Sequence, residues 1–204
     1  MQVIEWTRFL KDGLPHKEKL SSITIGVFDG VHLGHQSLIE KIVSHNVDNV
    51  PVVITFRQNH KIEKHTQNNR EPTEFPNKSN IQSLRQKTAV LESLGVKITV
   101  VIDFTESFMR MPGIEFLEIL LKHGRVGFLA VGNSFRCGYR LDTDAATIQK
   151  FFASRNIPVE IVPEVMEGGL PISSSRIRDA IASGNLPLAE KMLGRLLQPD
   201  FPSK

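Results

Sequence analysis

Residues 23–36, with the sequence ITIGVFDGVHLGHQ, decide how this chain folds. The alternating apolar residues over 23–27 predict a buried strand, and the amphipathic run over 36–43 predicts a helix. Gly26 near the end of the strand and Gly30 in the turn after it allow the backbone to approach a ligand closely. A helix that begins after such a turn presents unpaired N–H groups and the positive end of its dipole. The stretch therefore predicts an anion-binding site.

Two histidines follow the turn. His32 and His35 are three residues apart and share one face of a helix, so both imidazoles can donate hydrogen bonds to phosphoryl oxygens. Gly34 lies between them and, having no side chain, is expected to leave room for the anion. Incidental histidines and a metal site are the alternatives. A metal site requires a further His, Asp, Glu or Cys at a recognisable spacing, and none stands out. Phosphate is the preferred interpretation.

A second candidate phosphate site is the stretch 171–178, PISSSRIR. Its serines are good N-cap residues for a helix expected to continue to residue 183. Arg176 and Arg178 fall in the first turn of that helix, where the dipole disfavours cations. A bound polyphosphate would compensate for this, because backbone N–H groups, hydroxyls and a guanidinium would converge on it. The alternative is a serine-capped surface helix with solvated arginines.

The remainder of the chain alternates apolar strands with amphipathic helices, which predicts a mainly parallel α/β sheet flanked by helices. Further strands are expected over 50–56, 98–102, 128–131 and 159–162, and further helices over 81–94, 145–154 and 187–197. The run 108–123 is expected to break at its Pro-Gly pair before a helix. The polar stretch 60–80 is interpreted as a mobile loop or lid. One domain over 1–204 is expected, with 185–204 as a C-terminal helix and tail.

Composition narrows the class of protein. The 204 residues are 40% hydrophobic and 23% charged, as in ordinary globular proteins. The net charge is +3 without a concentrated Lys/Arg run, which argues against a nucleic-acid partner. The only cysteine, Cys137, cannot form an internal disulfide and fits a reducing compartment. No apolar run approaches a membrane span, and the N-terminus lacks a signal-peptide core, so a cytoplasmic protein without a membrane partner is expected.

The stretch T-I-G-V-F-D-G-V-H-L-G-H resembles the signature of the H-x-G-H nucleotidyltransferases, and specifically the adenylyltransferase module of bacterial FAD synthetases. The Phe-Asp-Gly-Val extension narrows the match to that module. The resemblance implies an α/β, Rossmann-like nucleotidyltransferase fold and the reaction FMN + ATP → FAD + pyrophosphate. It also implies ATP and Mg²⁺ as cofactors, with Mg²⁺ carried mainly on the phosphates and no metal site formed by the protein.

The resemblance also implies roles for individual residues. The stretch 171–178 is similar to the superfamily's I-S-S-T-x-I-R motif, and residues 130–140, AVGNSFRCGYR, resemble the loop V-G-x-D-F-R-F-G-K that helps to hold the nucleotide. Ser134 and Cys137 depart from that loop's usual residues. The catalytic residues implied are His32, His35 and Arg178. The ATP-binding residues implied are Gly26, Phe28, Asp29, Gly30, Gly34, Gly132, Asn133, Phe135, Arg136, Ser174 and Ser175.

The implied flavin site comprises Thr55, Phe56 and Phe104. Thr55 and Phe56 begin a segment that resembles T-F-x-P-H-P, in which Gln58 and His60 replace both prolines. Because proline fixes φ, their loss would loosen this wall of the flavin pocket. The small β-barrel riboflavin kinase module that normally follows is expected to be absent after Leu196, so a separate riboflavin kinase is the expected partner upstream.

Two other functions stay open. One is a different H-x-G-H enzyme, which would adenylylate another phosphate acceptor or transfer a cytidylyl group. The other is a non-catalytic paralogue that binds ATP or a flavin nucleotide. The complete set of His32, His35, Ser175 and Arg178 favours catalysis.

Overall fold

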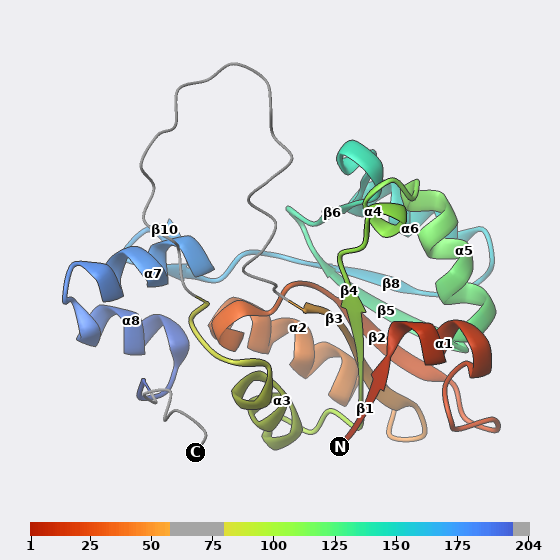
Figure 1. Cartoon of the computed structure of the whole chain (residues 1–204), viewed down its shortest axis with the longest axis horizontal. Coiled ribbons are helices and arrows are strands. Elements are labelled where there is room, and N and C mark those ends of the chain that lie inside the picture. The colour runs from red at the N-terminus through yellow and green to blue at the C-terminus, as the bar shows by residue number, and fades with distance from the viewer. Residues whose placement is uncertain (58–79, 198–204) are drawn as a thin grey trace.

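A six-stranded parallel sheet forms the centre of the computed structural model, which describes residues 1–57 and 80–197. Figure 1 shows helices on both faces of this sheet. The strand order is β1 (Gln2–Glu5), β4 (Ile98–Asp103), β3 (Val50–Arg57), β2 (Ser21–Ile25), β5 (Val126–Gly132) and β8 (Val159–Val162). The chain starts at one edge with β1, reaches the centre of the sheet at β2 and runs through β3 back to β4 beside β1. It then crosses to the other side of β2 and forms β5 and β8. The predicted α/β architecture is confirmed.

The sheet is apolar on both faces, as expected for parallel strands covered by helices. On one face, side chains of the strands pack against α1 (Trp6–Asp12), α5 (Gly113–His123) and α6 (Ala145–Ala153). On the other face they pack against α2 (Leu33–Ser44) and α3 (Leu84–Ser93). Full burial of each large apolar side chain contributes about 1.5–3 kcal/mol, so these two layers hold the strand ends in fixed positions.

The C-terminal helices form a third, smaller cluster. Helices α7 (Ser174–Ala182) and α8 (Leu186–Leu193) bury Ile177 and Met192 against each other. In Figure 1 they lie at the left edge of the molecule beside the start of α2. This placement brings two segments that are far apart in sequence to the same end of the sheet.

Short elements complete the described chain. They are α4 (Glu106–Met109), the 3₁₀ turns η1 (Asp29–Val31) and η2 (Tyr139–Leu141), and the small strands β6 (Arg136–Cys137), β7 (Thr143–Asp144), β9 (Met166–Glu167) and β10 (Leu170–Pro171). No helix among the described residues is long and apolar enough to cross a membrane.

Most predicted elements occur, with shifted ends. The strand predicted over 23–27 stops at Ile25, and Val27 is 41% exposed, because the chain turns sharply after Gly26. Helix α2 begins at Leu33 rather than residue 36 and therefore includes His35. The pair β1–α1 was not predicted, and the proposed lid over 60–80 lies, except for Asn80, outside the described residues.

Candidate active site

A cavity of about 650 Å³ opens at the carboxyl ends of the central strands. Ligands of open parallel sheets bind at this edge, and the volume suits a cofactor-sized ligand. One wall comes from the histidine turn, residues 26–35, and from the start of α7. The opposite wall is apolar and aromatic, and the loops after β5 and β8 close the third side. The cavity therefore has one polar end and one apolar end.

The histidine turn is a strained piece of backbone. Phe28 has φ 52° and Val31 has φ 38°, in the left-handed region that side chains other than glycine rarely adopt. Such strain persists only where the surroundings impose it. Here the carbonyls of Val27 to Val31 all accept hydrogen bonds from side chains of other segments. The donors are Thr55 and Lys87 to Val27, Gln82 to Phe28, Ser174 to Asp29, Arg195 to Gly30, and Gln36 and Arg195 to Val31.

His32 and His35 present imidazoles to the cavity from the first turn of α2. His32 is the N-cap residue, and its Nδ1 accepts the backbone N–H of His35 at 3.3 Å. That acceptor role requires an unprotonated Nδ1, so the neutral ring carries its proton on Nε2 and keeps a donor for a ligand. His35 Nδ1 is buried and has no hydrogen-bond partner among the described residues. Both rings therefore retain hydrogen-bonding capacity.

The expected gap between the histidines is not present. Their rings stack with centroids 3.6 Å apart, so no anion fits between them. A Cβ at Gly34 would lie 3.2 Å from the His32 ring, which means that Gly34 makes room for that ring. Gly26 likewise accommodates the ring of Phe28, and Gly30, with φ +79°, packs against Ile81. The prediction that Gly34 leaves room for an anion between the two histidines was therefore wrong.

Burial keeps both imidazoles neutral in the protein without ligand. Desolvation, and then the positive charge of Arg195, lower the pKa of His32 from 6.5 to about 4. Desolvation, followed by the charges of His32 and Lys87, lowers the pKa of His35 well below its ordinary value. An anion placed against these rings would raise both pKa values, because it stabilises the protonated forms. The pair is therefore suited to take up positive charge when phosphate binds.

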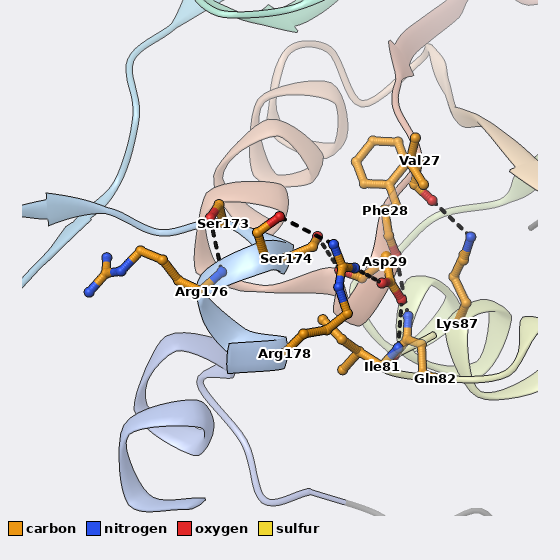
Figure 2. Close-up of polar contacts among 11 residues, drawn as sticks. Val27, Phe28, Asp29, Ile81, Gln82, Lys87, Ser173, Ser174, Arg176 and Arg178 are labelled. Atoms are coloured by element: carbon orange, nitrogen blue, oxygen red, sulfur yellow. Dashed lines mark hydrogen bonds and ion pairs between the residues drawn. The ribbon is translucent and has the colours of Figure 1, made fainter. Parts of the chain in front are cut away.

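The start of α7 lies against the histidine turn, as Figure 2 shows. Ser173 is the N-cap residue and accepts the backbone N–H of Arg176, while Ser174 donates to the carbonyl of Asp29 at 2.9 Å. The Arg176 guanidinium donates to the carbonyls of Glu167, Leu170 and Pro171, so it holds the β9–β10 hairpin. These contacts explain Arg176 without a bound polyphosphate.

Arg178 pairs with Asp29. Its Nη1 lies 2.7 Å from Asp29 Oδ2, and its Nη2 donates to Ser175. The second carboxylate oxygen accepts the backbone N–H of Ile81 at 3.0 Å, so Asp29 connects η1, the segment before α3, and α7. Asp29 is 1% exposed, and desolvation raises its pKa against the opposing effect of the hydrogen bond from Ile81 and the charge of Arg178. Arg178 Nε is buried without a partner among the described residues.

The apolar end of the cavity is built from phenylalanines. Phe56 and Phe104 stack with centroids 4.7 Å apart, and Phe108 contacts both rings. Phe56 is the second-last residue of β3, whereas Phe104 directly follows β4, so the pair joins two adjacent strand ends. An Arg57–Asp103 ion pair at 2.9 Å lies beside them. Such a wall suits a flat aromatic ring system, because offset and edge-on ring contacts are favourable.

Most of the residues singled out in the sequence line this one cavity. They are Gly26, Phe28, His32, Gly34, His35, Phe56, Phe104, Gly132, Asn133, Phe135, Arg136 and Ser174. Outside its lining lie Asp29, Gly30, Thr55, Ser175 and Arg178. Thr55 is buried and donates to the carbonyl of Val27 instead. Gln58 and His60 lie outside the described residues.

Two cations that the sequence reasoning gave no role also reach the turn. Lys87 donates to the carbonyl of Val27 at 2.8 Å, and Arg195 donates to that of Gly30 at 2.6 Å. Lys87 is 2% exposed, which is unusual for lysine. Its position on the inner face of an amphipathic helix was the one signal in the sequence that could have revealed it.

Comparisons with known proteins agree on one family. The FAD synthetase family model matches residues 14–176. The chain is 33% identical over 174 residues to a bifunctional riboflavin kinase/FMN adenylyltransferase of Escherichia coli strain K12, covering 84% of this chain and 53% of that protein. The corresponding protein of Buchnera aphidicola subsp. Schizaphis graminum is 29% identical, with coverage of 86% and 55%. The chain thus spans about half the length of these curated relatives.

Solved structures share the fold. The crystal structure of a macrolide-efflux protein from Streptococcus pneumoniae has a TM-score of 0.79 and 28% identity, covering 97% of this chain and 61% of that one. A pantoate-beta-alanine ligase from Francisella tularensis has a TM-score of 0.55 and 19% identity over 100% of this chain and 82% of its own. The second similarity concerns the fold alone.

Proposed function

Because this chain belongs to the FAD synthetase family, we propose that it is an FMN adenylyltransferase, which joins AMP from ATP to FMN and releases pyrophosphate. A phosphate oxygen of FMN forms a bond to the α-phosphorus of ATP, and the bond from that phosphorus to the bridging oxygen of the β-phosphate breaks. The observation that carries this proposal is the stacked pair of histidines in the first turn of α2, which line a cavity that also has an aromatic wall.

The proposed reaction requires positioning and charge stabilisation rather than a protein nucleophile. His32 and His35 would stabilise the charge that develops on the α-phosphoryl oxygens and on the departing pyrophosphate. Arg178 would hold the outer phosphates together with N–H groups at the start of α7, near Ser174 and Ser175. Cys137, the only thiol lining the cavity, is unsuited to nucleophilic attack, because burial raises its pKa to about 12.

Magnesium would enter this site with the nucleotide. Among residues 1–57 and 80–197, no group of three His, Cys, Asp or Glu side chains could hold a metal ion. The residues present therefore do not fit a protein-held Mg²⁺. Phosphate oxygens are ligands that Mg²⁺ prefers, which supports an ion carried on ATP.

The two ends of the cavity suit the two parts of FMN. Its phosphate is an anion and belongs at the histidine end, whereas its isoalloxazine ring is flat and aromatic and would lie against the wall formed by Phe56, Phe104 and the neighbouring phenylalanines. Gly132, Asn133, Phe135 and Arg136 lie on the β5 loop and would contact the adenine nucleotide. A riboflavin kinase is the proposed source of FMN, and a cytoplasmic location stays a prediction.

The decisive experiment incubates the pure protein with FMN, ATP and Mg²⁺ and resolves the products by chromatography. We expect FAD and pyrophosphate in equal amounts. Replacing FMN by nicotinate mononucleotide or phosphopantetheine tests for another acceptor of the same superfamily. A product with one of these and none with FMN would overturn the proposed substrate. Binding of ATP without any product would instead support a non-catalytic nucleotide-binding protein.

A further inference from the structure

Two cations, the buried Lys87 and the half-buried Arg195, donate hydrogen bonds to carbonyls of the strained histidine turn. Lys87 lies on α3 and contacts Val27, just after β2. Arg195 follows α8 and contacts Gly30 in η1. Neither side chain lines the cavity, so neither contacts the ligand directly there. Figure 2 shows Lys87 reaching Val27 beside the network that joins Asp29, Ile81 and Arg178.

Lys87 connects two strand ends. Its ammonium donates to the carbonyl of Val27 at 2.8 Å, to that of Phe56 at 3.3 Å and to Thr55 Oγ1 at 3.4 Å. Val27 leads into the histidine turn, and Phe56 belongs to the aromatic wall. This one side chain therefore links the histidine turn to the aromatic wall, in addition to the pairing of β2 with β3.

Arg195 makes the corresponding contacts on the other side of the turn. It donates to the carbonyls of Gly30 at 2.6 Å and Val31 at 3.1 Å, and to Gln82 Oε1 at 3.0 Å. Gln36 of α2 donates to the same Val31 carbonyl and to that of Leu193. The C-terminal helices are thus attached to the residue that precedes His32.

The charges of these two residues are not cancelled by direct contact. Within the described part of the chain, Lys87 and Arg195 donate to neutral oxygens, and neither forms an ion pair. Asp29 on η1 is the carboxylate whose charge acts on Lys87. After the larger effect of desolvation, the positive charge of Lys87 helps to lower the pKa of His35, and that of Arg195 helps to lower the pKa of His32. Each histidine is therefore under the electrostatic influence of one of the two cations.

We propose that Lys87 and Arg195 are positioning residues, which impose the strained conformation of the turn and thereby hold His35 and His32 against the ligand's phosphates. This inference rests on the proposed adenylyl transfer. Both cations also supply a fixed positive field at a phosphate site, where anions gain from such charges in a poorly solvated environment. Misplacement of reacting groups by about 1 Å costs on the order of a hundredfold in rate, so loosening the turn is expected to be visible in catalysis.

The test compares Lys87→Met and Arg195→Gln with two matched controls, Lys97→Met and Arg85→Gln, whose side chains are exposed. With FMN and ATP as substrates, we expect Lys87→Met and Arg195→Gln to lose roughly tenfold or more in kcat/KM. The two control variants should stay close to wild type. Because Lys87 joins both ends of the cavity, its variant should change the KM of FMN as well as that of ATP. Thermal unfolding of each variant verifies that it is folded.

A titration of the imidazole resonances by NMR separates the proposal from a general loss of stability. Lys87→Met should raise the pKa of His35, and Arg195→Gln should raise that of His32, since each removes a nearby positive charge. Arg195→Lys keeps the charge and should restore the pKa of His32 toward its wild-type value. The inference would be overturned if Lys87→Met and Arg195→Gln were folded and left both the histidine pKa values and kcat/KM unchanged. Wild-type protein that makes no FAD would overturn the proposed function, while this titration would still decide the role of the two cations.

Discussion

The histidine turn and the start of α7 were both expected to bind phosphate, but they differ in how many of their polar side-chain groups are already hydrogen-bonded within the protein. Each begins a helix with a side-chain cap, His32 for α2 and Ser173 for α7. At the histidine turn, the imidazoles face the cavity and keep hydrogen-bonding capacity. At α7, Ser174 is bonded to Asp29 and the guanidinium of Arg178 is paired with the same residue. The first region has its donors free, and the second has most of them occupied.

The difference shows how one helix terminus becomes a binding site and another becomes a support. Both provide backbone N–H groups and a positive dipole end. What distinguishes them is whether the neighbouring side chains already form hydrogen bonds or ion pairs within the protein before a ligand binds. Arg178 is intermediate, because its guanidinium is paired while its Nε is buried without a partner among the described residues. The experiments below test how far the two regions differ.

The largest effect is expected at His35. His35→Ala removes an imidazole from the cavity wall and should lower kcat roughly a hundredfold or more, since loss of one preorganised donor costs on the order of 3 kcal/mol. His45→Ala is the matched control, because His45 caps the other end of α2 and stacks on Phe128 outside the cavity. The measurement is FAD formation under saturating substrates. Turnover of His35→Ala equal to that of wild type would remove the histidine turn from the chemistry.

The second effect concerns acid stability. His32 has a pKa of about 4 in the fold and about 6.5 when unfolded, so the unfolded chain binds more protons between these pH values. The free energy of unfolding should therefore fall by about 3 kcal/mol as pH drops from 6.5 to 4. Urea denaturation across this range measures the slope. His32→Gln should flatten part of it, and added pyrophosphate should raise the histidine pKa and flatten it further. An unchanged slope in the variant would show that other groups govern the acid transition.

The third effect separates the two arginines of α7. Arg178→Gln should raise the KM of ATP about tenfold, because a charge-assisted hydrogen bond contributes about 1.5–3 kcal/mol. Arg176→Gln should leave that KM near wild type and lower Tm, since the Arg176 guanidinium donates to carbonyls of the β9–β10 hairpin. Steady-state kinetics and thermal unfolding of both variants make the comparison. Equal changes in KM would mean that α7 does not discriminate between them.

Local patterns predicted the fold well, because they follow from hydrophobic periodicity. The strands at 98–102 and 159–162 differ from β4 and β8 by at most one residue at an end. The pair β1–α1 was missed, since its strand has only four residues and alternates little in polarity. The start of α2 was placed too late, because a histidine serves as its cap and histidine is not a usual capping residue.

The sequence predicted which residues line the cavity better than it predicted how their side chains are arranged. Motif residues spread over the chain converge on one cavity, as strand ends in a parallel sheet require. The direction of Asp29 could not be read from the sequence, because it depends on the positive φ of Phe28. The contacts of Lys87 and Arg195 join residues 60 and 165 positions apart, and no local pattern encodes such pairs. These contacts with the histidine turn form only when α3 and the segment after α8 pack against it.

The smallest effect should come from Ser173, the cap of α7. Ser173→Ala removes the acceptor of the Arg176 N–H and should cost about 1 kcal/mol in the free energy of unfolding. Ser173→Asp keeps an acceptor and should retain that stability, while its charge should weaken ATP binding if phosphates lie nearby. Urea denaturation and the KM of ATP, measured on both variants, separate capping from binding. If Ser173→Ala raised the KM of ATP as much as Arg178→Gln does, the start of α7 would be a binding site in the same sense as the histidine turn. A loss confined to stability would show that Ser173 serves α7 as a cap and that the O–H donor it retains does not contribute to ATP binding.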